Sequence, residues 1–180
     1  IIVGGVGYTF NENGKAGDRA NDVLTFKEYN STYKESENYG STKTAPYDLD
    51  PEKYNMNFTN ENQIDKGFNE SIGLYQGMNA QEATSTLGHE AFVHGNVDAD
   101  NLTAVEKNLK NGVYKTTFDL MKDIKDRFFR GTKDHKAYKL DQVKKYKDYS
   151  KELTNKTGNK YYIDDYEKDK NKYNNEGYEY

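Results

Sequence analysis

Residues 86–95, TLGHEAFVHG, hold two of the three histidines in the 180-residue chain. Glu90 follows His89 directly, and His94 lies five residues after His89. A capping-box pattern at Asn79 and Glu82, followed by helix-compatible residues, predicts a helix over residues 80–94 that ends at Gly95. Successive residues of an α-helix turn by about 100°, so the two histidines would point about 140° apart in a regular helix.

Two local arrangements follow from this spacing. A π-type turn, with its i→i+5 repeat, would bring His89 and His94 to one side of the helix, and Gly88 would make the backbone adaptable there. A regular α-helix would instead place Glu90 and His94 on one face, because they are four residues apart. Glu90 is available as a general base in the first arrangement and becomes a ligand in the second, and the sequence leaves both open.

The third histidine, His135, follows Asp134, so both histidine motifs couple an imidazole to a carboxylate. The chain has no cysteine, and any metal must therefore be held by His, Asp or Glu. Three imidazoles, or two and a carboxylate, with one open position are typical of catalytic zinc. The sequence thus predicts Zn²⁺ held by His89, His94 and either His135 or Asp134. The plainer alternative is a partly buried helix whose histidines bond to their neighbours.

Residues 96–101, NVDADN, look like the start of a calcium-binding loop. The glycine and the closing glutamate that such a loop needs are missing, so a loop or a helix cap is the better interpretation. Asp98 is still a candidate as an alternative metal ligand or as a partner of one.

Hydrophobic patterning divides the chain into two halves. Short β-like segments are expected at residues 1–10, 23–29 and 54–59, and helices near residues 102–109, 117–130 and 132–153. From about Thr154 the chain is polar and rich in Tyr, Asn and Lys, which predicts a loosely packed or edge-strand appendage. We therefore expect one α+β domain over residues 1–180, with a small N-terminal β-sheet packed on C-terminal helices.

Composition narrows the range of partners. Hydrophobic residues make up 33% of the chain, below the usual ~45–50%, whereas tyrosine occurs 17 times, so we expect a modest core rich in tyrosine. A formal net charge of −4 offers no basic field for nucleic acid. The apolar run IIVGGVGYTF is too short for a membrane span and lacks the positive region of a signal peptide. We expect no nucleic-acid partner and no membrane partner.

The hexapeptide HEAFVH resembles the H-E-x-x-x-H motif of zincin metalloproteases, in the form found in dipeptidyl peptidase III. That resemblance implies a zincin-like fold and Zn²⁺ bound by His89 and His94. It also implies that Glu90 is the base that activates water for peptide hydrolysis.

Residues 131–138, GTKDHKAY, resemble the G-T-x-D-x-x-Y-G motif of the deuterolysin-type aspzincins. This second resemblance implies Asp134 as the third ligand and Tyr138 as a phenol that stabilises an oxyanion. The tyrosine lies one residue late and the final glycine is absent, which puts the role of Tyr138 in doubt.

A short, polar, cysteine-free domain with an HE motif is similar to zincin-like toxin domains of bacterial polymorphic, Rhs-type proteins. This similarity implies a metalloprotease effector that is secreted or delivered by a bacterium, with a protein or peptide substrate and a cognate immunity protein. The sequence leaves two alternative functions open: a metal-dependent nuclease toxin, and a non-catalytic binding or structural module.

Overall fold

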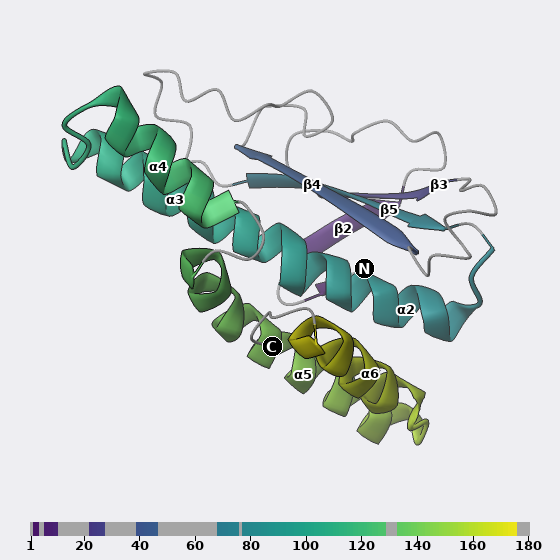
Figure 1. Cartoon of the computed structure of the whole chain (residues 1–180). Helices are drawn as coiled ribbons and strands as arrows, with labels where there is room; N and C mark the ends of the chain where they lie inside the picture. Colours follow the sequence, from purple (N-terminus) through teal and green to yellow (C-terminus); the bar gives the residue numbers. More distant parts are fainter. Residues whose placement is uncertain are drawn as a thin grey trace.

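A mixed β-sheet and a long helix with a π-helical segment in its middle meet at residues 86–95 (Figure 1). The computed structural model describes residues 2–3, 6–10, 22–27, 39–46, 68–75, 77–128 and 133–175. Its five strands follow the order β1-β2-β3-β5-β4 across the sheet. They are β1 (Ile2–Val3), β2 (Val6–Phe10), β3 (Asp22–Lys27), β4 (Gly40–Pro46) and β5 (Phe68–Tyr75).

Strand β5 lies between a parallel neighbour, β3, and an antiparallel neighbour, β4. Side chains alternate between the two faces of a strand, so Ile72 and Leu74 share one face, and both are buried in the core. Their partners on β4 are Thr42 and Gly40. The last described strand of the sheet therefore turns small residues toward the helices, which lets a helix approach closely.

Three helical segments follow one another without a break along the sheet: α2 (Ala80–Gly88), η2 (His89–Gly95) and α3 (Asn96–Lys110). Asn79 caps the first, its side-chain oxygen accepting the backbone N–H of Glu82 at 2.9 Å. The predicted helix end at Gly95 is wrong, because the chain stays helical there (φ −59°, ψ −52°). A Cβ at this position would lie 2.7 Å from the carboxylate of Glu70, so the glycine provides room for strand β5.

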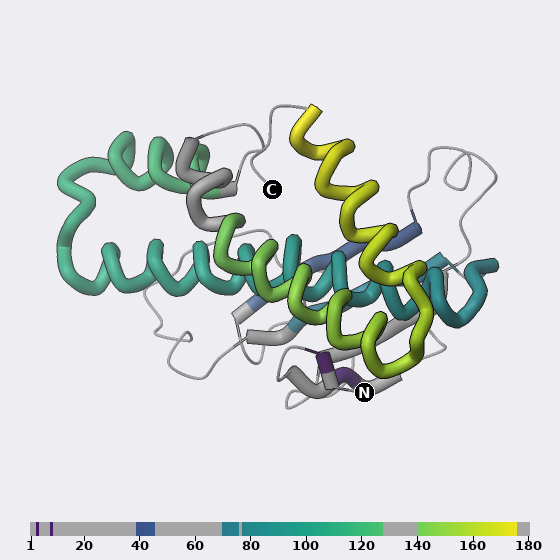
Figure 2. Tube along the Cα trace, turned by 90° about the horizontal axis from the view of Figure 1, so that it is seen from below, coloured from purple at the N-terminus to yellow at the C-terminus, as the bar shows by residue number. Residues whose placement is uncertain are grey.

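The remaining helices are α4 (Thr117–Phe128), α5 (Lys133–Thr157) and α6 (Tyr161–Asn175). Figure 2 shows α5 and α6 running beside each other across the long helix, on the side away from the sheet. The long helix thus lies between two layers. The buried core joins all three, and its members are Val3, Tyr8, Ile72, Leu74, Leu87, Ala91, Phe92, Val93, Val143, Tyr146 and Tyr166.

The prediction of a loosely packed or edge-strand appendage from about residue 154 is wrong. Helix α5 continues to Thr157, and α6 packs against it with Tyr162, Tyr166 and Tyr173 buried. These tyrosines supply the apolar face that the scarcity of aliphatic residues concealed, because most of a tyrosine side chain is hydrophobic surface.

The α+β class, with an N-terminal sheet packed on C-terminal helices, is confirmed. Strands β2 and β3 and the helices near residues 117–130 and 132–153 lie where the sequence predicts them. Strands β4 and β5 were not predicted, and the strand expected at residues 54–59 lies outside the described residues.

Replacing Tyr166 with alanine tests whether α6 is part of the core. Its side chain is 2% exposed, so Tyr166→Ala should lower the free energy of unfolding by about 3–5 kcal/mol in a denaturant titration. Asn171→Ala, on the exposed side of the same helix, should change it by less than about 0.5 kcal/mol. Equal, small effects of both changes would contradict the packing of α6.

Candidate metal centre

The π-helical segment η2 places both histidines on one side of the helix. The Nε2 atoms of His89 and His94 lie 3.1 Å apart, and the two rings meet edge to face. The predicted π-type turn is therefore confirmed, and the alternative of a regular α-helix is wrong. One additional residue in the turn compensates for the five-residue spacing.

Glu90 points from the same turn toward strand β4. It is buried, and the Thr42 hydroxyl donates a 2.6 Å hydrogen bond to its Oε2. A Cβ at Gly40 would lie 2.8 Å from the Glu90 side chain, so the strand approaches the carboxylate closely because it carries a glycine there. The possible ligand atoms of His89, Glu90 and His94 all lie within 4.8 Å of one another, and this group could hold a metal ion.

Helix α6 supplies a partner for His89 that the sequence did not reveal. The Asp169 carboxylate lies 2.6 Å from Nδ1 of His89. A carboxylate only accepts hydrogen bonds, so this contact assigns the ring proton of a neutral His89 to Nδ1. The Nε2 lone pair of His89 is then directed to His94, which donates the proton of the 3.1 Å contact.

Two tyrosines hold the His89 ring from other directions. Tyr173 of α6 stacks on it with ring centroids 5.8 Å apart, and Tyr146 of α5 meets it edge-on at 6.0 Å. Burial, and next the charge of Asp169, raise the pKa of Tyr146 well above its usual value. Tyr146 is therefore a neutral packing residue with a phenol that keeps its proton.

Gly88, immediately before the motif, serves a different purpose from the one predicted. It is helical (φ −60°), and a Cβ there would lie 2.3 Å from the ring of Tyr149. The residue thus lets α5 pack against the helix that carries the histidines, and the helical conformation at this position needs no unusual freedom.

A cavity of about 520 Å³ opens over the three clustered residues. Strand β4 forms one wall and α6 another, and Asp98, Lys168 and Lys172 also line it. Asp165 lines it too, where burial raises the pKa of its carboxyl group and a hydrogen bond from Ser85 opposes the shift. Carboxylates and ammonium groups therefore share the cavity with the imidazoles.

Three of the six predicted site residues come together: His89, Glu90 and His94. The other three, Asp134, His135 and Tyr138, fall on the first two turns of α5, where the side chains of residues 133–139 lie outside the described part of the chain. The α5 residue that contacts His89 is Tyr146, eleven positions after His135, and eleven residues of helix span about 16 Å. The roles of these three residues stay predictions.

Asp169, Thr42 and Gly40 were not predicted as site residues. For Asp169, the sequence offered one signal: Asp165 lies four residues before it, so the two carboxylates share one face of a helix. Nothing local to Gly40 or Thr42 indicated that β4 would lie against Glu90, since 48 residues separate Thr42 from that carboxylate.

Thr42→Val tests the contact that holds Glu90. The valine keeps the shape of the side chain and removes the hydroxyl, which leaves a buried carboxylate without this donor and should cost about 1–3 kcal/mol in unfolding free energy. Thr44→Val is the matched control, because that hydroxyl makes only a 3.5 Å contact to the Gly95 carbonyl. Equal losses in a denaturant titration would show that the Glu90 contact contributes nothing particular.

No protein-family model, curated protein or solved structure matches the chain. The geometry of the His89, Glu90 and His94 group is therefore the basis for assigning a function.

Proposed function

We propose that this protein is a zinc-dependent hydrolase that cleaves peptide bonds. The observation that carries the proposal is the convergence of two imidazole Nε2 atoms beside a buried carboxylate, inside a cavity large enough for part of a peptide. Two nitrogens bound to one tetrahedral zinc at about 2.0–2.1 Å would be about 3.4 Å apart. The observed 3.1 Å therefore fits a zinc site with only a small separation of the rings.

Each residue of the group has a distinct part in this proposal. Asp169 keeps the ring proton of His89 on Nδ1, so Nε2 is ready to bind a cation. To bind through Nε2, His94 would carry its ring proton on Nδ1, and because a doubly protonated imidazole cannot bind, the affinity for metal should fall at low pH. A bound zinc ion would supply Lewis acidity and lower the pKa of water to about 7. Glu90 would accept a proton from that water, with its carboxylate held in place by Thr42.

The position of β4 supports a peptide as the substrate. It is the last described strand of the sheet, and its residues Gly40, Ser41 and Thr42 line the cavity. An extended peptide can lie beside such a strand through main-chain hydrogen bonds. A scissile bond held there would be next to Glu90 and the two histidines.

One observation favours a second candidate, a metal-dependent nuclease. Lys168 and Lys172 line the same cavity, and ammonium groups bind phosphate oxygens. Four carboxylates line it as well, those of Glu90, Asp98, Asp165 and Asp169, and would repel a phosphodiester. We therefore favour the peptidase.

Asp98 is our candidate for the third protein ligand. It lies about one helical turn after His94, and it lines the cavity that contains the two imidazoles. Asp134 and His135 are the ligands that the sequence predicts, and the experiment below includes them.

The biological setting stays a proposal that rests on the sequence resemblance alone. The domain would act as a bacterial toxin or effector, secreted or delivered, and an immunity protein would cover the cavity. Expression of the chain in a sensitive bacterium, with and without a candidate immunity protein, tests this setting separately from the chemistry.

Metal analysis of variants defines the ligand set. The intact protein should hold about one zinc ion per chain, and His89→Ala, His94→Ala and Asp98→Asn should each lose it because a ligand is removed. Elemental analysis after dialysis measures the content, and His135→Ala and Asp134→Asn run in parallel. Full zinc content in both the His89 and His94 variants would overturn the site, and loss only in an α5 variant would move the third ligand there.

Glu90→Gln tests the hydrolase itself. It should keep zinc and reduce cleavage of unfolded protein by several orders of magnitude, because water activation fails while the histidines still bind metal. New peptide termini are counted by mass spectrometry, and single-stranded DNA and RNA are offered in parallel reactions. Cleavage of nucleic acid alone would establish the nuclease, and unchanged activity in this variant would refute a role for Glu90 as base.

Asp169→Ala tests the positioning of His89. Without the carboxylate, Nδ1 loses its acceptor and the ring is free to turn, so zinc affinity should fall by about 10–100-fold in competition with a chelator. Asp164→Ala, an exposed aspartate on the same helix, is the matched control and should leave affinity unchanged. Equal affinities in the two variants would contradict a role for α6 in the site.

A further inference from the structure

The hairpin formed by α3 and α4 carries four exposed hydrophobic side chains, on the turn and on the adjoining ends of both helices. These tip residues are Leu109, Val113, Phe118 and Met121, with exposures of 38%, 54%, 74% and 57%. Figures 1 and 2 show this turn projecting away from the sheet and from α5 and α6. Single exposed apolar residues are ordinary, but four around one projecting turn form a patch that points to a partner.

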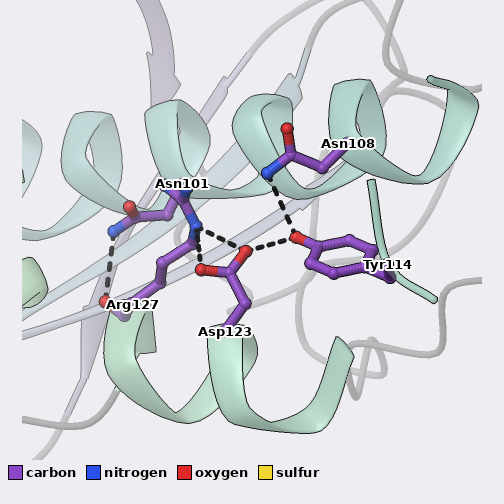
Figure 3. Close-up of polar contacts among 5 residues, drawn as sticks. All are labelled: Asn101, Asn108, Tyr114, Asp123 and Arg127. Atoms are coloured by element: carbon purple, nitrogen blue, oxygen red, sulfur yellow. Dashed lines mark hydrogen bonds and ion pairs between the residues drawn. The ribbon is translucent and has the colours of Figure 1, made fainter. Parts of the chain in front are cut away.

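The two helices are joined by polar contacts, and this explains how the hairpin can leave apolar side chains outside. Figure 3 shows the chain of contacts: Asn108 donates to the Tyr114 hydroxyl, which donates to Asp123. Asp123 also binds Arg127 at 3.0 Å, and the Arg127 carbonyl accepts a hydrogen bond from Asn101. The tip residues are thus not needed to hold α4 on α3.

This connection persists at any physiological pH. Burial, followed by the hydrogen bond to Asp123, raises the pKa of Tyr114 to about 12, so its hydroxyl keeps the proton that it donates. At the start of α4, Asp119 accepts the backbone N–H groups of Lys115 and Thr116. The hairpin therefore presents its tip on a rigid support.

Lysines gather around the tip residues, in a chain whose formal net charge is −4. Five exposed lysines surround the turn: Lys107, Lys110, Lys115, Lys122 and Lys125. Four acids lie in the same stretch, Glu106, Asp119, Asp123 and Asp126, and two of them, Asp119 and Asp123, bind partners within the hairpin. Phe118, Met121, Lys122 and Lys125 lie three or four residues apart and form one outward stripe of α4.

We propose that this tip docks on an anionic phospholipid surface, with Phe118 and Met121 in the headgroup region and the lysines on the lipid phosphates and carboxylates. Interfacial segments combine these features, an apolar face inserted about 5–10 Å deep and basic side chains beside it. The described helices include none long and apolar enough to cross a membrane, and docking at the surface needs none.

A projecting tip fits a lipid surface better than it fits a protein. A stable protein interface buries about 800 Å² on each partner, and four side chains at the end of one hairpin supply only part of that area. A bilayer accepts a convex wedge without a shaped pocket. This proposal is independent of the zinc site, and it departs from the expectation of no membrane partner that the net charge and the N-terminal run suggest.

Co-sedimentation of the whole chain with vesicles tests the proposal. The protein should bind vesicles that contain phosphatidylserine and stay in solution with phosphatidylcholine alone, and added salt should weaken binding. Phe118→Ala should reduce the partition coefficient by at least about tenfold. Lys122→Gln should reduce it by about fivefold, the loss of one basic side chain near a charged surface.

Two matched controls separate docking from general surface effects. Leu140→Ala removes an apolar side chain that is 45% exposed on α5, and Lys151→Gln removes an exposed lysine there. Both should leave vesicle binding unchanged, and circular dichroism should show the same helix content in all variants. Equal binding to both lipid compositions, no binding to either, or capture of an acidic protein without any vesicle binding would overturn the proposal.

Discussion

The i→i+5 turn at residues 89–95 is the feature on which the site depends. A π-type turn is rarer than a regular α-helical one, so the surroundings must hold it. They do so from two sides: Thr42 of the sheet bonds to Glu90, and Asp169 of α6 bonds to His89. The site is therefore a product of the layered packing, because neither the sheet nor α6 alone could fix both side chains.

At the contact between the helix and the sheet, a glutamate of each element packs against a glycine of the other. Glu90 of the helix lies where strand β4 has Gly40, and Glu70 of strand β5 lies where the helix has Gly95. Glu70 in turn accepts a hydrogen bond from Tyr8. Each carboxylate occupies the space that a missing Cβ leaves on the opposite element. Two buried carboxyl groups are accommodated at one interface in this way, each with a hydroxyl donor as partner.

Sequence patterns predicted the helical half of the fold because its apolar residues repeat with the helical period. They missed β4 and β5 because those strands turn Thr42 and Glu70 toward the helices, where a strand pattern expects apolar residues. They misjudged α6 because it contains few aliphatic residues, and its core positions are taken by Tyr162, Tyr166 and Tyr173.

The part of the histidine site that depends on residues close in sequence was predictable. The interval between His89 and His94 poses a choice between a π-type turn and a regular helix, and tertiary contacts decide it. The partner of His89 was beyond any local pattern, because Asp169 lies 80 residues later in the chain. A contact at that separation depends on the packing of α5 and α6, which sequence periodicity does not specify.

The same separation has a consequence during synthesis on the ribosome. His89 and His94 emerge well before Asp169, so the first imidazole lacks its carboxylate until α6 has left the exit tunnel and folded back. Until then both ring tautomers of His89 are open, and a cation that bound so early would meet an unoriented ligand. The order of translation thus delays the contact between His89 and Asp169 until the last described helix is made.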